Sequence, residues 1–184
     1  DPPPVARQPT VETHDAMARR PGSFVQVTGA FAQAKRVNPD FNGYINSVIT
    51  RLNVDRLPDT VRYARDMGAK LMVISNLTPE GLGFDDYERL TVRLEQLAEV
   101  LPSIPDVAGD MTVRFFGVPM CLLGPHRMLS NDLHWDPRVT VEWGDLPGKV
   151  AFQGFYNWTP DRKRVHAKEC TGCAWNTVCM GVYD

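Results

Sequence analysis

Four cysteines are the residues of this 184-residue chain best suited to chemistry. Near the C-terminus Cys170 and Cys173 form a CxxC pair, Cys179 follows after five further residues, and Cys121 lies well upstream. Thiolates at i and i+3 converge readily on one metal, and four of them suit tetrahedral zinc or a cubane iron–sulfur cluster. With no cysteine to spare, the sequence predicts one metal site with Cys121, Cys170, Cys173 and Cys179 as ligands, and it leaves the metal open.

The same cysteines have three other uses. A disulfide with two free thiols is disfavoured in a reducing compartment. A thioredoxin-type redox pair follows an early strand and begins a helix, whereas this CxxC lies in a C-terminal loop region. Cys121 follows an apolar strand pattern and is alternatively a small core residue.

The amino-acid composition limits the classes of partner that the chain is expected to bind. The formal net charge is −2, which indicates neither a nucleic-acid surface nor attraction to an anionic membrane. No run approaches the roughly 20 apolar residues of a membrane span. The opening residues, Asp1 to Pro4, lack the layout of a secretory signal. We therefore expect a cytoplasmic protein with no nucleic-acid or membrane partner, and its 43% hydrophobic residues support a buried core.

The elements that would position these residues alternate between helix and strand up to about residue 116. Ser23 is the expected N-cap of the first helix, and Gly68 is the expected stop of the second. The amphipathic pattern from Asp85 to Leu101 predicts the strongest helix. In chain order we expect a helix over 24–34, a strand over 41–50, a helix over 57–64, a strand over 70–75, a helix over 85–101 and a strand over 111–116. This βαβαβ order predicts an α/β fold with a parallel sheet, open or closed, and helices outside.

The pattern changes at residue 117, beyond which proline and glycine are frequent and helical periodicity is lost. Strands over 139–143 and 150–156 are expected to form a hairpin directly before the clustered cysteines. We predict a boundary here, with a domain over 1–116 and a loop-rich extension over 117–184. So small an extension has little core of its own, and a metal would stabilise it.

Several short motifs together resemble radical S-adenosylmethionine (SAM) enzymes that carry a C-terminal twitch or SPASM auxiliary-cluster region. They are Thr13-His14-Asp15, Arg20-Pro-Gly-Ser-Phe24, Asn46-Ser-Val-Ile-Thr-Arg51-Leu-Asn53, Val118-Pro-Met-Cys121 and Cys170-x2-Cys173-x5-Cys179-x-Gly181. The resemblance implies that residues 1–116 form the C-terminal half of a (βα)6 barrel. It also implies that residues 117–184 hold an auxiliary [4Fe–4S] cluster on the four cysteines, which favours iron–sulfur over zinc.

The resemblance further implies contacts to SAM at the ends of the strands. Asn46 and Arg51 would bond its ribose or carboxylate, and Ser75 and Asn76 would contact its adenine. The CxxxCxxC loop that such enzymes need for SAM cleavage is not in this sequence. We therefore expect the N-terminal radical SAM half as a partner, in the same or a separate chain, and no activity from this chain alone.

Two functions follow from these expectations. The chain is part of a radical SAM oxidoreductase or transferase that modifies a peptide or small molecule, and it supplies barrel wall, substrate pocket and one auxiliary cluster. Alternatively, it is a non-catalytic subunit, stapled by zinc or a cluster, that binds a protein partner.

Overall fold

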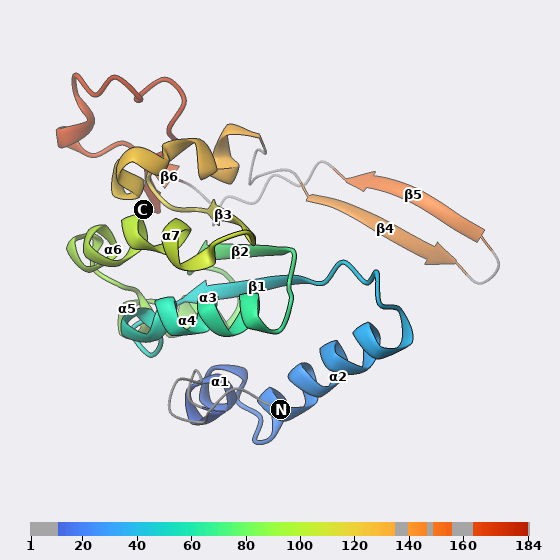
Figure 1. Ribbon diagram of the computed structural model, residues 1–184. Helices are drawn as coiled ribbons and strands as arrows, with labels where there is room; N and C mark the ends of the chain where they lie inside the picture. The colour runs from blue at the N-terminus through green and yellow to red at the C-terminus, as the bar shows by residue number, and fades with distance from the viewer. Residues whose placement is uncertain (1–10, 135–139, 147–148, 156–163, 184) are drawn as a thin grey trace.

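A three-stranded parallel sheet forms the centre of the chain (Figure 1). The computed structural model describes residues 11–134, 140–146, 149–155 and 164–183. The strands β1 (Tyr44–Ile49), β2 (Leu71–Asn76) and β3 (Thr112–Phe116) lie in that order. All three agree closely with the predicted strands, and their parallel pairing confirms the predicted α/β class.

Helices make the connections between the strands. The short η2 (Val54–Arg56) leads into α3 (Leu57–Asp66), which joins β1 to β2 and ends before Gly68 at φ 82°, as predicted. The longer connection from β2 to β3 contains α4 (Leu82–Asp85), α5 (Tyr87–Leu90), α6 (Leu94–Val100), η3 (Leu101–Ser103) and α7 (Ile104–Ala108).

The single helix predicted over 85–101 is wrong, because the chain is extended between α5 and α6. Thr91 and Arg93 both have ψ of 144°. Carbonyls at this break find partners on the loop after β1: the Arg51 amide donates to Leu90 O at 2.9 Å, and its Nε donates to Thr91 O at 2.6 Å. These bonds replace the helical ones, while Leu97 and Leu101 still reach the core as the pattern indicated.

One face of the sheet carries the core. The register places Met72, Ile74, Val113 and Phe115 on that face, and all four are buried. Side chains of α3, α6 and α7 cover them. Among the described residues the opposite face is less covered, with Tyr44 69% exposed, although Ser75 on that face is buried. The same core continues to Val118 and Leu123, beyond the domain boundary predicted near residue 117.

Two helices precede the sheet, α1 (Val11–Ala18) and α2 (Ser23–Val37), on the free-edge side of β1. Ser23, the predicted N-cap, is instead the first helical residue, and Asp15 of α1 caps α2. Its carboxylate accepts the N–H groups of Phe24 at 2.8 Å and Gly22 at 2.5 Å, together with the Ser23 hydroxyl at 2.9 Å. Those bonds, that from Phe24 foremost, lower the pKa of Asp15 to about 2. Within the described ranges no helix is long and apolar enough to cross a membrane.

The remaining elements follow β3. The segments η4 (Met120–Leu129) and η5 (Asn131–Leu133) come first, with a kink at Gly124. The strands β4 (Thr140–Leu146) and β5 (Lys149–Phe155) then pair antiparallel, which confirms the predicted hairpin. After residues 156–163, which lie outside the described ranges, β6 (Arg164–Val165) pairs with β7 (Val182–Tyr183) around η7 (Lys168–Cys170).

Candidate metal centre

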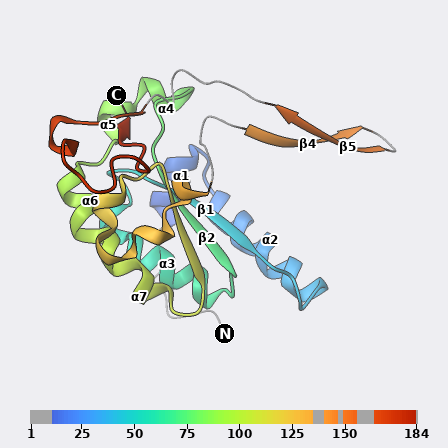
Figure 2. The same cartoon turned by 90° about the horizontal axis from the view of Figure 1, so that it is seen from above.

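Three of the four cysteines lie in one loop, residues 166–181, which we call the cysteine loop. Its ends are joined by β6 and β7, where Arg164 pairs with Tyr183 and Val165 with Val182. Successive turns shape it, with Cys173 N–H donating to Cys170 O at 3.1 Å and Cys179 N–H donating to Trp175 O at 2.8 Å. Backbone pairing therefore closes the loop at its two ends. Figure 1 shows it (red) at the upper left, and Figure 2 shows it from above, beside α6.

A buried ion pair ties the cysteine loop to the rest of the fold. The Arg164 side chain is 1% exposed and that of Asp132, in η5, is 0% exposed. Arg164 also donates to Gly181 O, from Nη2 at 2.7 Å and from Nε at 3.1 Å. One guanidinium thus joins η5 to the end of the loop that follows Cys179.

Gly181 permits the close approach of the two ends of the loop. Its φ is 82°, and a Cβ there would lie 2.1 Å from the carbonyl oxygen of Val165. No larger residue fits this position without moving β6. The glycine of the predicted Cys179-x-Gly181 motif therefore has a structural role of its own.

Cys121 comes to the site from a different segment, η4. Its neighbours Met120 and Leu123 are buried in the core, while Cys121 itself is exposed. Protein atoms packed around its sulfur raise the pKa of Cys121, and negative charge on the other cysteines raises it further, with Cys179 acting most strongly. Such charge effects need short separations. Cys121 therefore lies within electrostatic range of Cys170, Cys173 and Cys179.

Backbone N–H groups point at two of the sulfurs. Trp175 N–H donates to Cys173 Sγ at 3.5 Å, and Gly181 N–H donates to Cys179 Sγ at 3.4 Å. Bonds of this kind orient a metal-ligating sulfur and tune a bound metal. Arg127 of η4 lies 5.8 Å above the Trp175 ring, a second contact between η4 and the cysteine loop.

The donor set suits a thiophilic metal, although its side chains do not converge into a closed ligand cage. All four cysteines are free thiols. Among the residues that the structure describes, no three or more side chains of His, Cys, Asp or Glu are arranged as a metal site. The thiols therefore lie within electrostatic range of one another without forming such a site.

The four predicted SAM contacts do not form one group. Asn46 and Ser75 lie on the less covered face of the sheet, where the Ser75 hydroxyl donates to Asn46 Oδ1 at 2.8 Å. Arg51 is exposed and bonded to Thr91 O. Asn76 is buried on the opposite face, and its Oδ1 accepts the N–H of Leu77 at 3.0 Å.

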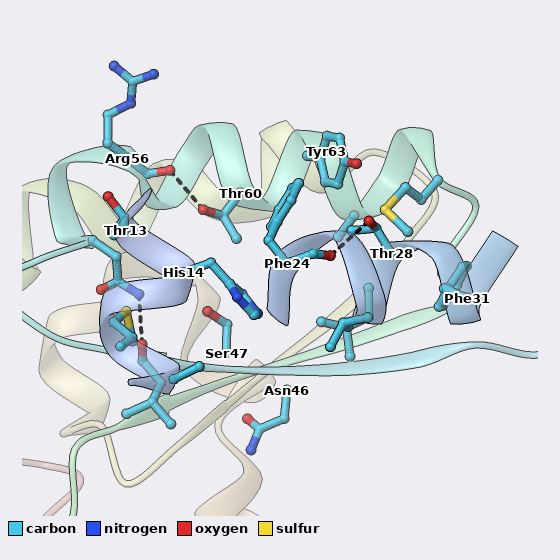
Figure 3. A pocket seen from close by; sticks show the side chains of 18 of the residues that line it. Thr13, His14, Phe24, Thr28, Phe31, Asn46, Ser47, Arg56, Thr60 and Tyr63 are labelled. Carbon is cyan, nitrogen blue, oxygen red and sulfur yellow. Dashed lines mark hydrogen bonds between the residues drawn. The ribbon is translucent and has the colours of Figure 1, made fainter. Parts of the chain in front are cut away.

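The structure also contains a cavity that the sequence did not predict. It has a volume of about 480 Å³ and lies between α1, α2, α3 and β1 (Figure 3). Phe24, Val27 and Phe31 line it, the same stripe of α2 that sequence periodicity predicts to be apolar. The stripe was the available signal, but periodicity alone does not show that a helix face is left without packing against the sheet.

Comparison of the chain with family models, curated proteins and solved structures finds no match. The function is therefore inferred from the chemistry of this chain's own side chains.

Proposed function

We propose that this chain forms the C-terminal part of a radical SAM enzyme and that its four cysteines hold an auxiliary [4Fe–4S] cluster. Such a part would supply barrel wall, substrate pocket and cluster for radical modification of a peptide or small molecule. The observation that carries the proposal is that Cys121, on η4, lies within electrostatic range of the three thiols of the cysteine loop. Two segments distant in sequence thus bring their cysteines into the same region of the fold.

The residues fit this group in number and in chemistry. Four thiolates would ligate the four irons and leave none open to substrate, so the cluster would transfer electrons. The N–H groups of Trp175 and Gly181 would stabilise the negative charge on Cys173 and Cys179. The tie between Arg164 and Gly181 O would hold the loop against η5.

The sheet supports the barrel part of the proposal. Its three parallel strands carry their helices on one face and leave the other less covered, which is the arrangement of a barrel wall. Asn46 and Ser75 meet on that less covered face and are the residues we propose to contact SAM. Arg51 and Asn76 are bonded elsewhere and would have to exchange partners first.

A second candidate is a non-catalytic subunit whose cysteine loop is stabilised by a structural zinc ion. The observation that favours it is the tie of the cysteine loop to the core through the Arg164–Asp132 pair, a structural arrangement that needs no redox chemistry. Zinc accepts four thiolates equally well and would stabilise the loop.

Metal and sulfide analysis on protein purified without air distinguishes the two candidates. About four irons and four sulfides per chain support the auxiliary cluster, whereas one zinc without sulfide supports the staple. The sharpest variant is Cys121→Ser, because this residue lies about fifty positions before the other three cysteines and on a different segment. It should lose metal as completely as Cys173→Ser, while Thr171→Ala in the same loop should keep it. Full metal in Cys121→Ser would refute the four-ligand site.

A further inference from the structure

The buried Arg164 guanidinium joins a chain of contacts that runs from η5 to a cysteine sulfur. On one side its Nη1 donates to the Asp132 carboxylate. On the other side its Nη2 and Nε both donate to Gly181 O, at 2.7 Å and 3.1 Å. A planar guanidinium that makes all these bonds has little freedom to turn, so it fixes its partners relative to one another.

The glycine that Arg164 holds also donates to a predicted metal ligand. Gly181 N–H donates to Cys179 Sγ at 3.4 Å. The φ of Gly181 is 82°, and a glycine has many other backbone conformations available to it. The direction of this N–H therefore depends on what holds Gly181 from outside, and the two bonds from Arg164 are such a hold.

The other N–H group that bonds a cysteine sulfur is held differently. Trp175 N–H donates to Cys173 Sγ at 3.5 Å, while Trp175 O accepts the N–H of Cys179, within the cysteine loop, at 2.8 Å. Arg127 contacts the ring of Trp175, at 5.8 Å, rather than its backbone. Of these two sulfur donors, only Gly181 has its backbone bonded by a buried charged side chain from outside the loop.

We propose that Arg164 is a positioning residue for the metal centre: it orients Gly181 so that the Gly181 N–H stays bonded to Cys179 Sγ. This inference rests on the proposed function, in which the four cysteines hold an iron–sulfur cluster. A cluster that accepts an electron gains negative charge, and hydrogen bonds to its sulfurs stabilise that charge and raise the reduction potential. Loss of Arg164 should therefore make the cluster harder to reduce, although Arg164 is not a ligand.

The pairing with Asp132 allows this positioning effect to be separated from an effect of charge. The two side chains are buried together and their formal charges cancel. Removing both releases Gly181 O and leaves the net charge near the metal centre unchanged. If Arg164 acted only through its charge, the double change would not shift the potential, whereas positioning requires a shift.

Reductive titration of the full chain with dithionite, on protein purified without air, tests the proposal. Wild type and Asp132→Leu/Arg164→Met are compared at equal iron and sulfide content. A wild type without iron and sulfide would refute the proposed function, and that failure is distinct from the absence of a shift. In the double variant the equilibrium constant for one-electron reduction should fall about tenfold, which is about 59 mV. Lys168→Met, which removes an exposed charge from the same loop, should change it less than about twofold.

Amide hydrogen exchange on the metal-free chain is a second readout that needs no cluster. In the double variant, exchange at Gly181 should be at least about threefold faster because its N–H is released, while exchange at Trp175 should not change. A change below about twofold in the reduction constant, with iron and sulfide retained, would overturn the proposal. Unchanged exchange at Gly181 would also overturn it. So would equal acceleration at Trp175, because the ion pair would then only hold the loop together.

Discussion

Replacing Asp132 by Asn should destabilise the protein strongly, because it leaves the Arg164 guanidinium buried without its counter-charge. The two side chains are 0% and 1% exposed, so water cannot replace the lost carboxylate. Breaking a buried pair in this way costs about 3–5 kcal/mol, against a total stability of about 5–15 kcal/mol for a typical domain. The carbonyl of Gly181 still accepts from Arg164 but carries no full charge.

Urea unfolding of wild type and Asp132→Asn measures the effect, and exchange of the Val165 and Val182 amides shows whether β6 and β7 open first. Asp66→Asn removes an exposed partner of Arg65, 41% accessible, and should cost less than about 1 kcal/mol. The double variant Asp132→Leu/Arg164→Met removes both charges and should be more stable than Asp132→Asn. A loss below about 1 kcal/mol in Asp132→Asn would refute the reasoning, because it would mean that the guanidinium is hydrated.

Three further outcomes are expected. Because the pKa of Asp15 falls from 3.8 to about 2, its cap stabilises α2 fully above pH 3.8 and is lost as pH falls through 2, so Asp15→Asn should flatten Tm between pH 5 and pH 2; an unchanged profile would contradict the cap. Gly181→Ala should lower Tm more than Gly172→Ala, since both glycines have positive φ but only the first would press a Cβ onto Val165 O; equal losses would show that strain alone matters. Phe115→Ala should cost about 3–5 kcal/mol in urea unfolding because the ring is 0% exposed, and a cost under about 1 kcal/mol would indicate that β3 is not central to the core.

Local patterns were sufficient to predict the sheet. The run Leu71–Asn76 begins with four apolar residues, of which Met72 and Ile74 are buried beneath the helices, and the sequence shows this run directly. The stop of α3 at Gly68 was equally local, since a glycine at positive φ ends a helix wherever it occurs. The hairpin of β4 and β5 was also predictable, because the turn residues that join two strands lie next to them in the sequence.

Contacts distant in sequence decided the features that were missed. The break between α5 and α6 depends on Arg51, forty positions before Thr91, whose carbonyl it binds. Periodicity in the segment itself contains no trace of that bond. The cap on α2 likewise comes from Asp15 in the preceding helix, where a local reading favoured Ser23.

The candidate site likewise has a part that local sequence predicts and a part that depends on distant contacts. The CxxC pair and Cys179 just after it indicated three ligands, since their proximity is local. That Cys121 joins them depends on the packing of η4, and the sequence supported it only through a count of cysteines and a resemblance. Asn46 and Ser75, on neighbouring strands, meet because of the sheet register, while Asn76 lies one residue further on and thus faces the other way.

The closure of the cysteine loop by β6 and β7 sets the local concentration of thiols. Three of them are confined to one loop, and the fourth is fixed to a core that is folded already. A metal that bound there would order side chains rather than a whole chain, so little of its binding free energy would be spent on loop closure. The fourth thiol, in contrast, is available only while η4 remains packed. Partial unfolding of that segment would turn a four-thiolate site into a three-thiolate one, and metal release would then report on the stability of the core.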